Sequence, residues 1–217
     1  MLNEQVIAYC ERTDFSYWSE PVNALSNVSF LIAAAIVWRQ TGGLPLARAM
    51  VVVLAAIGLG SLLWHTHATR WAGLADVLPI LVFILLYLFA ATRHFLGLRP
   101  VWALAAVLLF LPYAAGFVWG MGLVVPGLGA NAAYFSVAVL IAAYGLWLRD
   151  SPTGKGMLAG AGILCVSLGF RMADDAVCAV FPTGTHFMWH ILNGVMLGWM
   201  IHVYCRHMKG MRGSSAG

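Results

Sequence analysis

Seven long apolar segments constrain what this chain can fold into more than any other feature of its sequence. A bilayer holds no water that could hydrogen-bond to backbone groups, so a segment that crosses it must be helical, and about 20 residues span the hydrocarbon core. Breaks that contain glycine or proline separate most of the segments. We therefore predict an all-α membrane protein, a bundle of seven transmembrane helices near residues 23–38, 47–64, 77–91, 101–119, 132–148, 157–172 and 187–204.

The composition supports a membrane protein and argues against a soluble domain. Hydrophobic residues make up 62% of the 217 residues and charged residues only 9%, whereas about 25% of a typical soluble domain is charged. The sequence pI is near 9.0, but the basic residues are scattered at the ends of the apolar segments, so we do not expect nucleic-acid binding. The compact chain and its short loops favour a bacterial protein, and we expect a multi-pass protein of a bacterial inner membrane.

Lysine and arginine predict how the bundle is oriented. With the N-terminus outside, nine of the 12 basic residues fall on the cytoplasmic side, as the positive-inside rule expects. The three that fall outside are Arg12, Arg70 and Arg171. The first 20 residues are polar and lack the apolar core of a signal peptide. We therefore expect an extracytoplasmic segment at 1–22, a transmembrane domain at 23–205 and a cytoplasmic tail at 206–217.

Five polar residues stand out, because ionisable side chains within membrane helices are costly and usually functional. Ser61 and His65 are four residues apart and share one helix face. His186 and His190 have the same spacing, which lets two imidazoles bind one metal ion. The predicted topology brings these four residues and Asp76 to one level near the outer surface. Three neutral imidazoles with an open fourth position are typical of a catalytic zinc site, in which a nearby carboxylate takes a proton and a hydroxyl stabilises an oxyanion.

A single histidine at the end of a membrane helix is more often an interfacial residue than a metal ligand. We give that interpretation to the four remaining histidines: His67, His94, His202 and His207. Two histidines in helical register, with a third histidine and an aspartate at the same depth, rarely occur together by chance. The metal site is therefore the favoured hypothesis.

The four cysteines divide by predicted depth. Cys165 lies in the middle of a predicted span and Cys205 at the cytoplasmic end, so we expect both to be free thiols. Cys10 and Cys178 both fall outside, where disulfides persist. Topology alone leaves open whether these two form a disulfide or are unrelated small residues.

The same site residues resemble a known family. The pattern Ser61-x3-His65-x10-Asp76, with His186-x3-His190 on the last span, is similar to that of the alkaline ceramidases. These belong to a wider group of seven-helix membrane hydrolases that includes adiponectin-type receptors and GPI-lipid remodelling proteins. The resemblance covers most of the chain and extends to Tyr9-Cys10-Glu11, to Glu20-Pro21-Val22-Asn23-Ala24-Leu25-Ser26-Asn27, and to Asp174/Asp175 with Cys178.

The resemblance implies a role for each site residue. It implies that His65, His186 and His190 bind zinc. Asp76 would be the general base, and Ser61 would orient water or stabilise the oxyanion. It also implies a disulfide between the N-terminal segment and the last outer loop, which would join Cys10 to Cys178.

The resemblance further suggests a calcium site in the N-terminal segment. Glu11 and Glu20 match two of the family's acidic positions, and Asp14 lies one place beyond an expected asparagine. Ala8 stands where another acidic residue is expected, and Ca²⁺ prefers six or more oxygen ligands. Acidic surface residues are the alternative interpretation.

These observations favour a zinc-dependent lipid amidase that hydrolyses ceramide, or a similar N-acyl lipid drawn from the membrane, to a fatty acid and a free amine. A phospholipid esterase and a seven-helix lipid receptor or sensor on the same scaffold are the alternatives. A retinal-binding pump needs a lysine in the middle of the last span, but Lys155 and Lys209, the only lysines, lie toward the cytoplasmic side. No sequence pattern indicates an oligomeric state.

Overall fold

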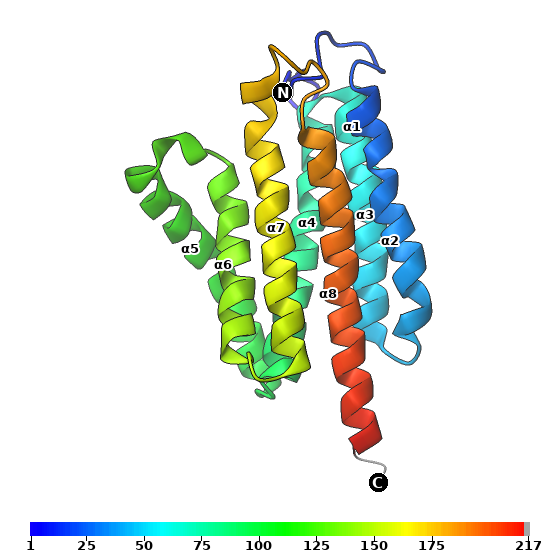
Figure 1. The fold of residues 1–217 in the computed structure, drawn as a ribbon, viewed down its shortest axis with the longest axis vertical. Coiled ribbons are helices and arrows are strands. Elements are labelled where there is room, and N and C mark those ends of the chain that lie inside the picture. Colours follow the sequence, from blue (N-terminus) through cyan, green and yellow to red (C-terminus); the bar gives the residue numbers. More distant parts are fainter. Residues whose placement is uncertain (215–217) are drawn as a thin grey trace.

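A computed structural model describes residues 1–214, which form a bundle of helices that is 79% helical and contains no strand in that range. Figure 1 shows the helices running side by side, with the N-terminus at one end and the C-terminal helix projecting from the other. Three short helical turns, at Arg39–Thr41, Ala91–Phe95 and Pro126–Leu128, extend or connect the main helices. The main helices are α1 (Pro21–Ser26), α2 (Val28–Trp38), α3 (Pro45–His67), α4 (Arg70–Ala90), α5 (Pro100–Val124), α6 (Asn131–Trp147), α7 (Pro152–Val177) and α8 (His186–Ser214).

Every predicted apolar segment lies mainly or wholly within a helix, which confirms the all-helical class. Helix α6 is apolar but has only 17 residues, and α8 is long but carries several histidines. Together the long apolar helices indicate a multi-pass membrane protein. Within residues 1–214, five stretches are long and apolar enough to cross a membrane: Pro21–Thr41, Pro45–His67, Arg70–Phe95, Pro100–Val124 and Pro152–Val177.

Several helices extend beyond their predicted ends. Helix α4 begins at Arg70, so Asp76 lies in its second turn rather than before the helix. Helix α7 continues to Val177, so Arg171, which was counted among the outer charges near the predicted end at residue 172, lies well inside the helix. Helix α8 continues through most of the predicted tail, and 215–217 lie outside the described residues. Hydropathy marks only the lipid-facing part of a helix, whereas backbone hydrogen bonding carries the helix further.

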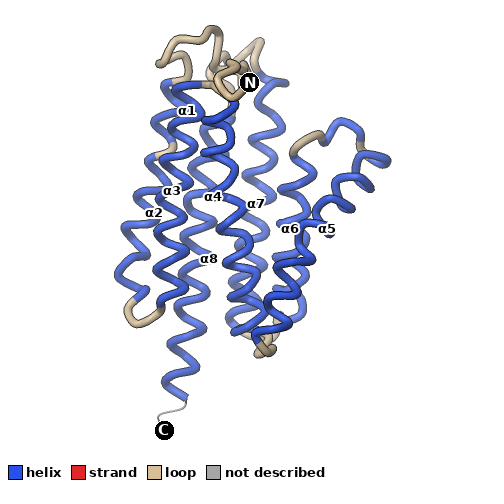
Figure 2. Tube along the Cα trace, turned by 180° about the vertical axis from the view of Figure 1, so that it is seen from behind, coloured by secondary structure: helices blue, strands red, loops and turns tan. Residues whose placement is uncertain are grey.

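Close helix packing holds the site-bearing part of the bundle together. A methyl group at Gly60 on α3 would lie 2.0 Å from the carbonyl oxygen of Ala75 on α4, so only glycine allows this approach. A methyl group at Gly194 on α8 would lie 2.9 Å from Ser29 Oγ on α2. Helix α5, in contrast, leans away from its neighbours at the end near its C-terminus (Figures 1 and 2). Helices α3 and α4, which carry Ser61, His65 and Asp76, are therefore very closely packed.

The first 20 residues fold over one end of the bundle, where Figure 2 shows loops gathered above α1, α3 and α7. The backbone N–H of Val6 donates to the carbonyl of Ala68, at 2.8 Å, where α3 ends. A disulfide joins Cys10 to Cys178, just beyond α7, as the resemblance implied. The N-terminal segment is therefore tied to both α3 and α7 and forms one face of the site described next.

Candidate metal centre

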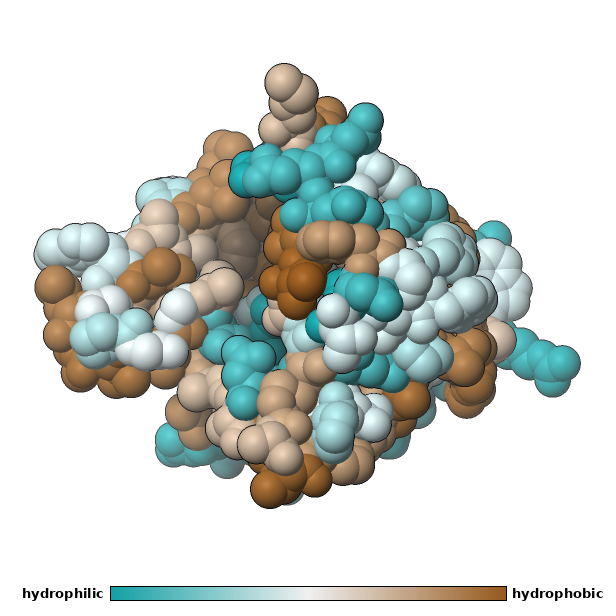
Figure 3. Space-filling model, turned by 90° about the horizontal axis from the view of Figure 1, so that it is seen from above, coloured by the Kyte–Doolittle hydropathy of each residue, from teal (hydrophilic) through white to brown (hydrophobic). Residues whose placement is uncertain are grey.

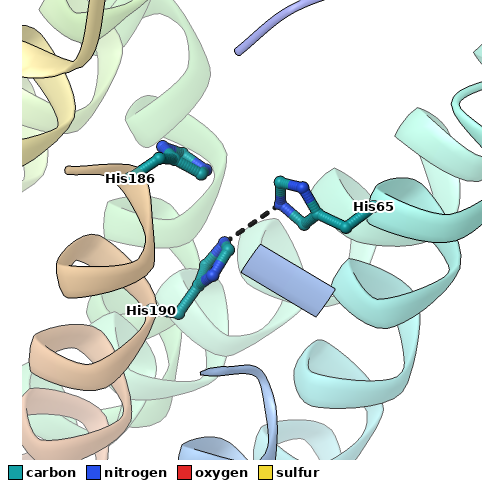
Figure 4. A group of neighbouring side chains, drawn as sticks. All are labelled: His65, His186 and His190. Carbon is teal, nitrogen blue, oxygen red and sulfur yellow. Dashed lines mark hydrogen bonds between the residues drawn. The ribbon is translucent and has the colours of Figure 1, made fainter. Parts of the chain in front are cut away.

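Three histidines meet near the end of the bundle that the N-terminal segment covers. His65 lies in the last turn of α3, and His186 and His190 lie in the first two turns of α8. Figure 4 shows the three rings pointing toward one another. One ring nitrogen of each lies within 4.8 Å of the other two, and each side chain is about 1% exposed. These three buried histidines could hold one metal ion.

Hydrogen bonds assign the protons on two of the rings. His65 Nδ1 lies 2.6 Å from a Glu20 oxygen, which can only accept, so this nitrogen carries a hydrogen. Ser26 Oγ donates to the Asn23 carbonyl at 2.7 Å and therefore accepts from His190 Nδ1, also at 2.7 Å. If both rings are neutral, their Nε2 atoms, which face each other at 3.1 Å, are then unprotonated.

Two facing lone pairs require a positive species close by. A third ring nitrogen, His186 Nδ1, is buried and has no hydrogen-bond partner within the described residues. Buried polar atoms without partners are uncommon and often mark the place of an unseen ion or water. The donor set of three neutral imidazoles therefore fits a divalent transition-metal ion.

Glu20 and Arg12 form a buried ion pair behind His65. Arg12 Nε donates to Glu20, and Arg12 Nη2 donates to the His65 carbonyl at 2.8 Å. Burial acts to raise the pKa of Glu20, but hydrogen bonds from His65 and Arg12 and the charge of Arg12 outweigh it and hold that pKa below its ordinary value. Glu20 is therefore a carboxylate that fixes the orientation and tautomer of His65, a common arrangement behind metal-bound histidines.

Replacing Glu20 with Gln should weaken metal binding about 10- to 100-fold, which is the usual effect of losing such a partner. The amide is neutral and can present its NH2 group to His65 Nδ1, so it no longer favours the required tautomer. Competition titration against a zinc chelator measures the change. Glu11→Gln is a matched control: Glu11 accepts from the backbone N–H groups of Val22 and Asn23 and should leave affinity within about threefold of wild type. Equal affinities for the two variants would contradict this role for Glu20.

Ser61 and Asp76 lie on facing helices next to the histidines. The Ser61 hydroxyl lies near the Asp76 carboxylate, and the positive charge of Arg171 acts on Asp76. Gly60 explains their proximity, because the close approach of α3 to Ala75 brings the next residue of each helix together. All five residues predicted from the sequence therefore occupy one end of the bundle.

Two cavities meet at this cluster. A narrow cavity of about 90 Å³ extends from Ser61, Asp76 and His190 into the bundle, where its wall is almost entirely apolar and reaches Ala91 and Met200. A second, open pocket of about 310 Å³ lies between the N-terminal segment and the helix ends, and it includes Tyr9, Arg171 and His186. Figure 3 views this end of the molecule and shows a hollow with hydrophilic and hydrophobic residues at its rim. Asp76, Ile80, Tyr134 and Trp189 line both cavities.

Asp174 sets the position of His186. Its Oδ1 accepts from the backbone N–H groups of Thr185 and His186, at 2.7 and 2.9 Å, and its Oδ2 accepts from the Cys10 N–H at 3.0 Å. Gly184 has a positive φ of 65° and packs against this carboxylate so closely that a methyl group would lie 2.1 Å from Oδ1. One buried carboxylate thus caps α8 and anchors the N-terminal segment to it.

The structure does not bring the three predicted calcium ligands together. Glu11 accepts hydrogen bonds from backbone amides at the start of α1. Asp14 binds the hydroxyl of Ser16 at 2.6 Å on the surface, and Glu20 binds Arg12 and His65. Within residues 1–214, the only histidine, cysteine or acidic side chains grouped closely enough to share an ion are the three histidines. The geometry therefore supports one metal centre and gives the acidic residues other roles.

The histidines that the sequence analysis set aside lie apart from this centre. His202 Nδ1 is 2.6 Å from Gln40 Oε1, and His207 Nδ1 is 2.9 Å from Thr153 Oγ1. The His94 ring contacts the Tyr204 hydroxyl, and the His67 ring packs on Trp71. None of the four belongs to the metal-binding group found in residues 1–214.

Sequence reasoning missed the residues that support the ligands. Arg12 was counted only as an outer charge, and Glu20 was assigned to calcium. Ser26 and Tyr9 were noted only as part of a resemblance, yet Ser26 binds His190 and the Tyr9 ring stacks on His186 with 3.7 Å between centroids. Polar residues crowded just before the first apolar segment were the available signal, but their partners lie tens of residues away in sequence.

Comparison with protein-family models finds none that matches this chain. Comparison with curated proteins likewise finds no match. The functional assignment therefore depends on the chemistry of the site itself.

Proposed function

We propose that this protein is a zinc-dependent amidase that cleaves the N-acyl bond of a membrane lipid, ceramide or a similar N-acyl lipid, to give a fatty acid and a free amine. One observation carries the proposal: a narrow apolar cavity ends at Ser61, at Asp76 and at His190, which is one of the three clustered, buried histidines. Ligand sites of this kind are mostly apolar with a few convergent polar groups. The apolar wall suits a hydrocarbon chain, and a reactive carbonyl would then lie at the polar end of the cavity.

His65, His186 and His190 would hold the zinc ion. When bound, zinc acts as a Lewis acid that lowers the pKa of water and polarises a carbonyl. Glu20 and Ser26 keep the two Nε2 atoms available by accepting the Nδ1 hydrogens. The burial of these groups and the apolar cavity wall exclude bulk water from the reacting carbonyl.

Asp76 and Ser61 would perform the proton transfer and the charge stabilisation. Water adds across the amide bond, so its oxygen joins the acyl carbon, the carbon–nitrogen bond breaks, and the leaving nitrogen gains a proton. Asp76 lies at the junction of the two cavities, where it can accept a proton from the attacking water and deliver it to that nitrogen. Ser61 can donate its hydroxyl hydrogen to the carbonyl oxygen as negative charge develops there.

We also infer that seven helical stretches cross the membrane with the N-terminus outside. The low apolarity of α8 comes partly from His186, His190 and Asn193, which are buried in the protein and do not face lipid. The disulfide lies at the end that holds the metal centre, which favours an oxidising compartment there. Protease or tag accessibility in intact cells tests the orientation: access to the C-terminus without permeabilisation would overturn it. The bacterial inner membrane remains a prediction from the sequence.

Purified protein tests the proposed activity directly. We expect hydrolysis of an N-acyl lipid in detergent, loss of that hydrolysis after chelation, and its return on addition of about one equivalent of Zn²⁺. Lipid extracts of cells with and without the protein should show which N-acyl lipid decreases. A phospholipid cleaved at its ester while every amide is left intact would replace the amidase with an esterase on the same site. Bound zinc without hydrolysis of any lipid would favour a lipid sensor.

A further inference from the structure

Arg171 is a partly buried cation in the open pocket beside the metal centre. It lies within α7, and its Nε donates to Asn131 Oδ1 at 2.8 Å. Its Nη1 donates to the Tyr9 hydroxyl at 3.2 Å. The guanidinium carbon lies 5.7, 5.4 and 5.2 Å from the ring centroids of Tyr9, Tyr134 and Trp189. Three aromatic rings and one amide therefore hold this cation in place.

No carboxylate forms an ion pair with Arg171 among residues 1–214. Glu20 binds Arg12 and His65, and Asp174 binds backbone amides. Asp76 also lines the open pocket and its charge acts on Arg171, but it lies beyond ion-pair distance of the guanidinium. Tyr9 is a neutral phenol near pH 7, because the ordinary tyrosine pKa is about 10. A charge removed from water is costly unless an opposite charge or several hydrogen bonds compensate it. Arg171 thus has unused capacity for an anion.

The position of Arg171 indicates which part of a substrate would carry that anion. Arg171 lines the open pocket together with His186 and Asp76, but not the narrow apolar cavity. The ring of Tyr9 stacks on His186 and its hydroxyl reaches Arg171, so the cation and the metal centre lie on either side of one aromatic residue. If the acyl chain occupies the narrow cavity, the amine side of the lipid lies in the open pocket next to Arg171.

We infer that Arg171 binds an acidic group on the amine side of the lipid, so that the protein selects anionic N-acyl lipids over neutral ones. This inference rests on the proposed amidase activity for its orientation. Carboxylate and phosphate both suit the guanidinium, which offers paired N–H donors to either oxyanion. The acidic group could therefore be the carboxylate of an N-acyl amino acid or the phosphate of an N-acyl phosphoethanolamine.

Matched substrates test the selection. N-dodecanoylglycine and N-dodecanoylethanolamine share an acyl chain and an amide and differ mainly in the acidic group. We expect wild type to favour the glycine conjugate by about 10- to 100-fold in kcat/KM, the usual worth of a charge-assisted hydrogen bond, and Arg171→Gln to bring that ratio close to one. Arg171→Lys should give an intermediate ratio. Arg149→Gln, at an exposed arginine outside both cavities, is the control and should keep the wild-type ratio.

Binding to metal-stripped protein separates this inference from the proposed function. Trp189 contacts Arg171 and lines both cavities, so its fluorescence can report binding without turnover. Tighter binding of the glycine conjugate than of the ethanolamide, lost in Arg171→Gln, would support the anion site even if no lipid were cleaved. N-dodecanoyl phosphoethanolamine binding more tightly than the glycine conjugate would identify phosphate as the preferred group.

Two results would overturn the anion site. One is equal binding of the acidic and neutral amides by the wild-type protein, a measurement that does not depend on how any variant folds. The other is Arg171→Gln protein with one metal ion per chain and an unchanged preference. Either result, together with zinc-dependent hydrolysis of both amides, would support the amidase activity but not the anion site. Arg171 would then only pack against its aromatic neighbours.

Discussion

His190→Ala protein should bind no zinc at stoichiometric concentration and should hydrolyse N-acyl lipids only at the background rate. His190 supplies one of three ligands, and its Nε2 faces that of His65 at 3.1 Å. Two remaining imidazoles leave a site with half its coordination open, whereas catalytic zinc sites usually keep three protein ligands. We expect the loss of affinity to exceed the roughly 10- to 100-fold effect that is typical of outer partners. Elemental analysis of purified protein and a lipid hydrolysis assay measure the two effects.

The control variants carry the same substitution elsewhere in the bundle. His202→Ala removes a histidine from the same helix, about three turns further along. The His202 ring contacts Gln40 and does not belong to the metal-binding group. This variant should keep one zinc per chain and wild-type turnover. His65→Ala and His186→Ala should behave like His190→Ala. Full turnover by a variant of any of the three clustered histidines would disprove the proposed role of the metal.

The part of the site that lies in regular helices could be predicted from the sequence. His186 and His190 are four apart on one helix, so their common face follows from helical geometry. The depth of His65 and Asp76 follows from the order of the apolar segments, because consecutive spans run in opposite directions. Ser61 lies one turn before His65 on the same helix. Periodicity and topology together therefore placed all five residues near one point.

The residues that support this site could not be placed in the same way. Arg12 and Glu20 lie in an irregular segment, and their contact with His65 joins positions 45 or more residues apart. No period in the sequence encodes such a contact. The positive-inside rule used Arg12 only as a topology signal, and the resemblance assigned Glu20 to a calcium site. Their burial, at 3% and 2% exposure, is what identifies them as part of the centre.

Arg171 shows the same limit within a helix. Hydropathy ended the sixth predicted span near residue 172, so this arginine read as an outer charge near the end of a span. In the structure α7 continues for another turn, and the side chain turns toward three aromatic rings. Those rings come from the N-terminal segment, α6 and α8, which only the tertiary fold brings together. The residues that would select a substrate are therefore harder to predict from the sequence than the reactive groups.

Asp76→Asn should separate metal binding from turnover. Asp76 is not part of the three-histidine group, so the variant should keep about one zinc per chain. Its amide cannot accept the proton from water, and the loss of a general base typically slows a reaction about 10²- to 10⁴-fold. We therefore expect kcat to fall within that range while zinc content stays constant. Single-turnover hydrolysis with zinc measured in the same sample provides the comparison.

Ser61→Ala distinguishes two ways in which Asp76 could act. If Ser61 donates to the developing oxyanion, its removal should slow turnover about 10²-fold or more with the metal retained. If Ser61 only holds the neighbouring Asp76 in position, the double variant should be no slower than Asp76→Asn alone, because the effect of Ser61 would then pass entirely through the carboxylate. A double variant slower than either single one shows that the hydroxyl acts on the substrate itself. Asp76→Asn protein that loses its zinc would instead make Asp76 a fourth ligand, and the proton acceptor would have to be sought elsewhere in the pocket.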